Sequence, residues 1–92
     1  MDSQERLNHL PEEIITSFSS DFVYLVSGDR IQHFPAREWD TAKYLSMLEE
    51  KAGEYDLMEW QGNVVAIANH SELIVIMPKF TTISQLKEDY FS

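Results

Sequence analysis

The sequence has no cysteine, few basic residues and no long apolar run, and each absence excludes a class of protein. Without cysteine, the chain forms no disulfide scaffold, no thiolate metal site and no thiol nucleophile. Against 16 Asp and Glu there are 7 Lys and Arg, so the net charge is −9 and the clustered cations that bind nucleic acid or anionic lipid are lacking. The apolar runs at 64–68 and 73–77 are far below the ~20 residues that cross a bilayer, and the N-terminus lacks a signal-peptide pattern. We therefore expect a cytoplasmic protein without nucleic acid partners or membrane insertion.

Length and composition predict one globular domain. A chain of 92 residues closes a single core but leaves too little sequence for a second independent module. Hydrophobic residues make up 43% of the chain, well above the content of a disordered protein. Residues 1–92 are therefore expected to form one domain.

Apolar spacing predicts a helical segment at 3–18 that buries one face. Its stripe consists of Leu7, Leu10, Ile14 and Phe18, widened by Ile15. Pro11 followed by two glutamates is typical of a first helical turn, so the main helix is expected to begin there after a short turn.

A second helix is predicted at 35–54, with Gly53 at its C-terminal end. Its main stripe contains Trp39, Ala42, Leu45, Leu48 and Ala52, and an adjoining stripe contains Tyr44 and Met47. Thr82 and Gln85 have the spacing of a capping box, which predicts a last helix with Ile83, Leu86 and Tyr90 on its buried edge.

The remaining segments predict five strands. "FVYLVSGDRIQHF" is typical of a β-hairpin around Gly28, and "DLMEW", "VVAIA" and "ELIVIMP" form a three-stranded meander. The last two runs have no polar side, so we place them at the centre of the sheet with helices on both faces, and "DLMEW" at an edge. The sequence thus predicts an α+β fold of order α-β-β-α-β-β-β-α with a five-stranded antiparallel sheet.

No motif predicts catalysis, a cofactor site or a metal site. The three histidines, His9, His33 and His70, lack metal-ligand spacing. Adjacent carboxylates on one helix point about 100° apart, so the pairs at 12–13, 49–50 and 88–89 are expected to be solvated. We therefore expect a protein that is not an enzyme.

Bulky aromatic and Met side chains suggest a partner or dimer interface. The candidates are Trp39, Tyr44, Met47, Met58 and Trp60. Two interpretations stay open for them, completion of the core or a surface that another chain covers.

The hairpin "FVYLVSGDRIQHF", the helix after it and "LMEWQGNVVAIANHSELIVIMP" together resemble the Roadblock family of dynein light-chain and GTPase-regulator domains. Longin and profilin-like domains share parts of this pattern. The resemblance implies a central helix on one sheet face and the terminal helices on the other. It also implies a homodimer that pairs through 35–54 and 55–60 and serves as a non-catalytic scaffold or regulator of a small GTPase, motor or signalling assembly.

The acidity of the chain supports a second hypothesis. An inhibitor or immunity protein of a phage or toxin system would use acidic side chains to block a basic partner or to imitate DNA. Such mimicry requires carboxylates gathered on one exposed face, whereas a scaffold is compatible with scattered acids and one apolar patch. An enzyme and a small-ligand sensor rank behind these two.

Overall fold

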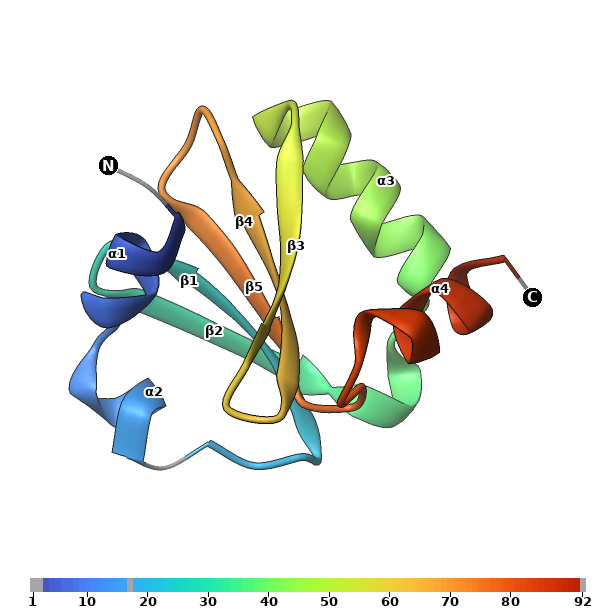
Figure 1. Ribbon diagram of the computed structural model, residues 1–92, viewed down its shortest axis with the longest axis horizontal. Coiled ribbons are helices and arrows are strands. Elements are labelled where there is room, and N and C mark those ends of the chain that lie inside the picture. The colour runs from blue at the N-terminus through green and yellow to red at the C-terminus, as the bar shows by residue number, and fades with distance from the viewer. Residues whose placement is uncertain (1–2, 17, 92) are drawn as a thin grey trace.

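Helices precede, separate and follow two groups of strands, a hairpin and a three-stranded meander (Figure 1). The computed structural model describes residues 3–16 and 18–91. The elements are α1 Ser3–Asn8, α2 Glu12–Thr16, β1 Phe22–Ser27, β2 Arg30–Pro35, the 3-10 turn η1 Ala36–Glu38, α3 Thr41–Ala52, β3 Tyr55–Trp60, β4 Asn63–Ala68, β5 Leu73–Met77 and α4 Ile83–Tyr90. The expected α+β class with a five-stranded antiparallel sheet is confirmed.

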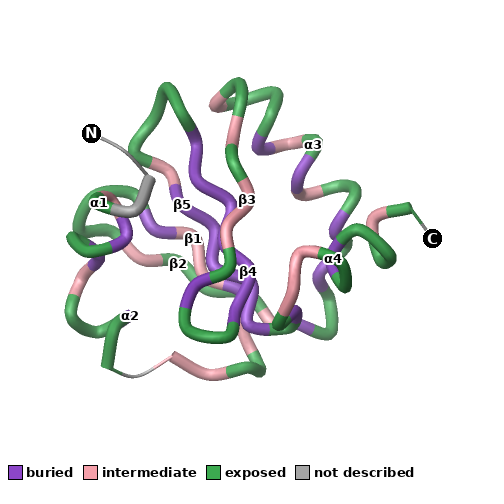
Figure 2. Tube along the Cα trace, in the orientation of Figure 1, coloured by how far each residue is buried: buried purple, intermediate pink, exposed green. Residues whose placement is uncertain are grey.

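The strands lie in the order β2-β1-β5-β4-β3. All of β4 and most of β5 are buried, and in Figure 2 these two strands form a continuous purple centre. The two apolar runs therefore occupy the middle of the sheet, as their lack of a polar side predicts, because helices cover both faces. β3 lies at one edge as expected, and β2 lies at the other.

Two tight turns fix the register of the hairpins. Ser27 pairs with Arg30, and Gly28 has a φ of +62° at the first position of the connecting turn. Trp60 pairs with Asn63 through Gln61 and Gly62, both with positive φ, which is the geometry of a type I′ turn.

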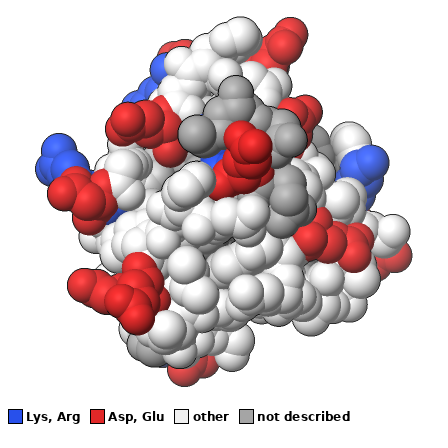
Figure 3. Space-filling model, turned by 60° about the vertical axis from the view of Figure 1, so that its left-hand side comes forward, with Lys and Arg blue, Asp and Glu red and all other residues white. Residues whose placement is uncertain are grey.

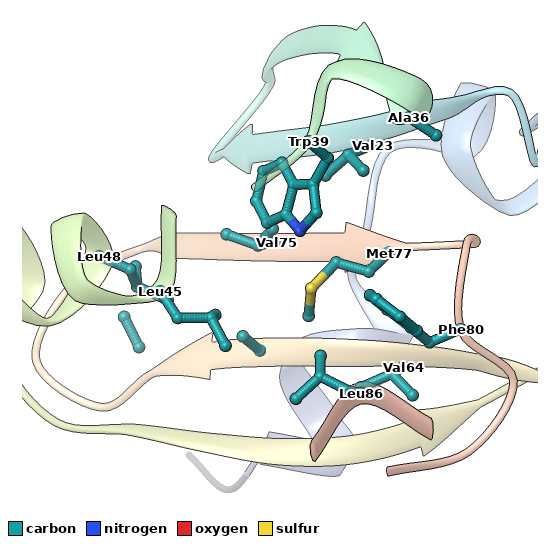
Figure 4. Close-up of a cluster of buried hydrophobic side chains, with 12 residues drawn as sticks. Val23, Ala36, Trp39, Leu45, Leu48, Val64, Val75, Met77, Phe80 and Leu86 are labelled. Atoms are coloured by element: carbon teal, nitrogen blue, oxygen red, sulfur yellow. The ribbon is translucent and has the colours of Figure 1, made fainter. Parts of the chain in front are cut away.

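Two hydrophobic clusters lie on opposite faces of the sheet. On the face that we call the α3 face, side chains from α3, α4 and the segment before α3 converge on β4 and β5 (Figure 4). On the opposite face, which we call the α1 face, α1, α2 and the connection between them contribute Leu7, Leu10 and Ile14 to one cluster with Val65 and Ile76. The predicted stripe of the N-terminal segment is thus buried, with Phe18 packed beside it.

Ile15 does not belong to that stripe, and the N-terminal segment is not one helix. Pro11 separates α1 from α2, and its carbonyl accepts from Ile14 and Ile15 at the start of α2. The direction of α2 leaves Ile15 38% exposed, so the expectation that it widens the buried stripe is wrong.

The central helix begins later than the sequence predicts. β2 continues to Pro35, and α3 starts only after Asp40, whose carboxylate accepts from the Lys43 amide at 3.1 Å. The buried stripe of α3 is therefore set by Thr41, Leu45 and Leu48, and Ala42 is exposed instead of buried. Gly53 ends the helix with a φ of +78°, as predicted.

The two terminal helices cover opposite faces, in contrast to the arrangement implied by the resemblance. α4 lies on the α3 face, where Leu86 joins the same cluster as Leu45. The Thr41 hydroxyl also donates to Asp89 at 2.5 Å, which links the start of α3 to the end of α4. The expectation that both terminal helices would lie opposite the central helix is therefore wrong.

Candidate protein-interaction site

β3 carries the free edge at which the sequence places an interface. Within residues 3–16 and 18–91, β3 pairs with β4 on one side and with no strand on the other. The Asn69 amide donates to the Glu54 carbonyl at 2.9 Å, and Trp60 flanks the tight turn, so alternate residues from Glu54 to Trp60 bond to β4. Tyr55, Leu57 and Glu59 therefore direct their backbone N–H and C=O groups away from the sheet.

A groove of about 560 Å³ runs beside this edge on the α3 face. It lies between the end of α3, β3 and α4, and its walls are contributed by Glu49, Glu54, Tyr55, Asp56, Leu57, Asn69, Ile83 and Lys87. Tyr55 and Leu57 are half-buried and pack against the core cluster, so they give the groove an apolar floor.

The electrostatics of the groove are negative near the end of α3. Burial raises the pKa of the Tyr55 phenol, and the nearby Tyr90 and the Glu49 carboxylate raise it further. Glu49 and Glu54 are exposed, while Lys87 supplies a positive charge from α4. A cation at the α3 end of the groove would thus meet carboxylates beside an apolar surface.

Glu59 positions α4 against β3. Its carboxylate accepts from the Ile83 amide at 3.1 Å, at the first residue of α4. A negative charge at a helix N-terminus is favourable because the amide groups there are unpaired and the helix dipole is positive. Glu59 therefore holds one wall of the groove in place, a role that sequence reasoning missed.

The capping box of α4 also differs slightly from its prediction. The Thr82 hydroxyl accepts from the Gln85 amide at 3.2 Å, as expected. The Gln85 side chain, however, accepts from the amide of Thr81 at 2.9 Å, one residue before the cap.

The five expected interface residues are divided between the two faces. Trp39 is buried on the α3 face, where its ring stacks on Tyr44 with centroids 4.4 Å apart. Trp60 is buried on the α1 face with its ring 5.8 Å from Phe18, and the half-buried Met58 packs in the same cluster. The two tryptophans therefore lie on opposite faces of the sheet, and the five residues do not form one continuous surface.

The half-buried members of this set stay candidates for contact with a partner. Met47 on α3, Tyr44 and Met58 are all intermediate in exposure, whereas Trp39 and Trp60 contribute to the core. The residues that line the groove were missed because they belong to three elements, and no signal in one segment brings them together. The sequence did offer a cue to the floor of the groove. Residues alternate between the two faces of a strand, which puts Tyr55 and Leu57 on one face and Asp56 and Met58 on the other.

Metal-ligand groups and membrane-spanning helices are absent from the described residues. Among residues 3–16 and 18–91, no group of three or more His, Asp or Glu is arranged to hold a metal ion. His9, His33 and His70 are exposed at separate places. No helix in the described part of the chain has the length and apolar character required to span a membrane.

Acidic side chains occur in several separate groups on the face seen in Figure 3, with basic side chains mostly toward its margins. Comparison with known proteins gives no family model, no curated protein and no solved structure that matches this chain.

Proposed function

We propose that this protein is a non-catalytic interaction module that binds a protein strand along the free edge of β3. The observation that carries the proposal is the unpaired outer side of β3, with Tyr55, Leu57 and Glu59 directing backbone groups outward. Such an edge is a template for strand addition, in which main-chain hydrogen bonds supply affinity and neighbouring pockets supply specificity.

A second copy of the chain is the first partner to consider. Antiparallel pairing about a two-fold axis centred on Leu57 would join outward-facing residues and place Tyr55 opposite Glu59 of the partner subunit. In this register Asp56 lies opposite Met58 of the partner subunit, so no two carboxylates are directly opposed. The homodimer expected from the sequence is thus compatible with the geometry of this edge.

The resemblance to the Roadblock family suggests which kind of protein such a homodimer would bind. A homodimer of this kind would act as a scaffold or regulator of a small GTPase, motor or signalling assembly. The alternative, an acidic inhibitor or DNA mimic, requires one gathered acidic face. On the face seen in Figure 3 the acidic groups lie apart, so this face does not offer the gathered carboxylates that mimicry requires.

The test is light scattering coupled to size-exclusion chromatography over a dilution series. The wild type is expected to elute with a mass about twice 10.7 kDa at high concentration. Leu57→Pro should shift it to the monomer because proline removes the outward N–H and leaves the bonds to β4 intact. Leu57→Ala is the matched control, since it loses the same side chain but keeps the N–H.

Circular dichroism and the fluorescence of the two buried tryptophans, Trp39 and Trp60, establish that both variants are folded. A dimer in which Leu57→Pro and Leu57→Ala dissociate to the same extent would contradict strand pairing and indicate a side-chain interface. A wild type that stays monomeric throughout would exclude the second copy and leave only a different protein as the source of the strand.

A further inference from the structure

The groove beside β3 has a charge pattern that selects among possible partner strands. Glu49 comes from the last turns of α3 and Glu54 from the connection to β3, and both line the groove at the same end of the strand. Asp56 lies on the same edge, and the one basic lining residue, Lys87, comes from α4. Carboxylates therefore outnumber cations along the path of an added strand.

The floor of the groove is suited to the aliphatic part of a long basic side chain. Tyr55 and Leu57 are half-buried, and Ile83 borders them from α4. Lysine and arginine bury their methylene stems on apolar surface while their charged ends stay hydrated or paired. A stem lying over Tyr55 and Leu57 would bring its charged end toward Glu49 and Glu54.

The geometry of an added strand supplies such side chains at the right spacing. Alternate residues of a strand point to the same face, about 6.6 Å apart. A strand bonded to the outward groups of Tyr55, Leu57 and Glu59 would therefore place every second side chain over the groove. The intervening side chains would lie on the α1 face, where Asp56 and the half-buried Met58 are their neighbours.

We propose that the groove and the β3 edge together bind an extended segment of another protein that carries Lys or Arg at alternate positions and apolar residues between them. This inference rests on the proposed function, because both require strand addition to β3. A basic partner and a second copy of the chain would compete, because both would bind the same edge of β3. The net charge of −9 favours the basic partner and weakens pairing with a second, equally acidic copy.

The first experiment is fluorescence anisotropy at low salt with a labelled peptide, Thr-Lys-Val-Lys-Val-Lys-Thr, at protein concentrations where the chain is monomeric. The same peptide with Glu in place of Lys is the charge control. The Lys peptide is expected to bind, with an affinity that falls as salt is added, and the Glu peptide is expected not to bind.

A pair of matched variants locates the charges. Glu49→Gln with Glu54→Gln should weaken binding of the Lys peptide by about fivefold or more, since it removes both carboxylates at the α3 end of the groove. Glu13→Gln with Glu38→Gln removes the same charge from exposed positions outside the groove and should change the affinity by less than about twofold.

Amide hydrogen exchange separates strand addition from simple charge attraction. With the Lys peptide bound, the amides of Tyr55, Leu57 and Glu59 should exchange at least about tenfold more slowly, because each acquires a hydrogen-bond partner. The amides of Asp56 and Met58, which already bond to β4, should change much less.

The outcomes separate this inference from the proposed function. If the Lys peptide binds without protecting those three amides, it does not add to β3 and the basic partner is wrong, while the interaction module is decided separately by the Leu57→Pro test. If the amides are protected but the Glu peptide binds equally well, or the Glu49 and Glu54 variant keeps full affinity, the basic partner is wrong and the interaction module stands. If the Lys peptide does not bind while Leu57→Pro abolishes a wild-type dimer, the edge serves a second copy and the basic partner is again overturned.

Discussion

The two faces of the sheet are both covered by helices, yet the helices are stabilised in different ways. On the α3 face, α3 has Asp40 and Gly53 at its ends, and the Thr82 hydroxyl caps α4. On the α1 face, α1 and α2 span six and five residues. Isolated helices of that length are unstable in water, because the first turn costs more conformational entropy than its few hydrogen bonds return.

Tertiary contacts replace local signals on the α1 face. The Arg6 guanidinium donates to the carbonyls of Ala68 and Ser71, which anchors α1 to the end of β4 and the loop after it. Leu7 is 1% exposed and Ile14 is 2% exposed, so the two short helices are held mainly by what they bury. One face of the sheet is thus covered by helices with local capping signals, and the other by helices whose stability depends on contacts with the sheet.

The largest expected effect comes from removing one buried leucine from each face. Leu7→Ala and Leu45→Ala should each lower the free energy of unfolding by about 2–5 kcal/mol, because both leave a cavity under a helix. Urea denaturation followed by circular dichroism measures the loss. The two variants should differ in amide hydrogen exchange. Leu7→Ala is expected to accelerate exchange in α1 and α2 before the sheet opens.

The control for this pair is Ile15→Ala, at a site that is 38% exposed, which should cost much less than either leucine. If Leu7→Ala left exchange in α1 and α2 unchanged relative to the sheet, the two faces would unfold as one unit and the contrast would be lost.

An intermediate effect is expected at Arg6. Arg6→Ala should lower the free energy of unfolding by about 1–2 kcal/mol, since hydrogen bonds from a charged donor are lost at a half-buried site where water replaces part of the interaction. Arg37→Ala removes an exposed arginine and serves as the matched control. Equal stability of the two variants in urea would show that the anchor of α1 contributes nothing.

The smallest effect concerns the helix caps of the α3 face. Thr82→Ala should cost about 1 kcal/mol, because the Gln85 amide at the start of α4 loses its acceptor. Thr82→Ser keeps a hydroxyl and should retain most of the stability in thermal denaturation. A Thr82→Ser protein as unstable as Thr82→Ala would assign the effect to the lost methyl group instead of the cap.

Much of the fold was predictable because its signals are local. The two apolar runs indicated β4 and β5 at the centre, and Gly53 indicated the end of α3. The start of α3 was misplaced because Trp39 precedes Ala42 by three residues, a helical spacing, even though the backbone at Trp39 is extended, and the capping role of Asp40 was not recognised.

The candidate site was predictable only in part. The edge position of β3 followed from its charged residues, and Met58 and Trp60 drew attention because of their size. The groove could not be predicted from the sequence, since Glu49, Leu57 and Ile83 belong to separate elements. Trp39 and Trp60 were grouped by residue type, whereas the pleat and the path of the chain put them on opposite faces.

The sequence by itself determined the fold class, the hairpin turns and the central strands, because periodicity and turn chemistry act over a few residues. Only the tertiary structure decided that α4 joins α3 on one face, that Glu59 meets the start of α4, and that a groove with two glutamates opens beside β3. Those contacts join residues that are distant in the chain, and their energy depends on how whole elements pack, which no local pattern encodes.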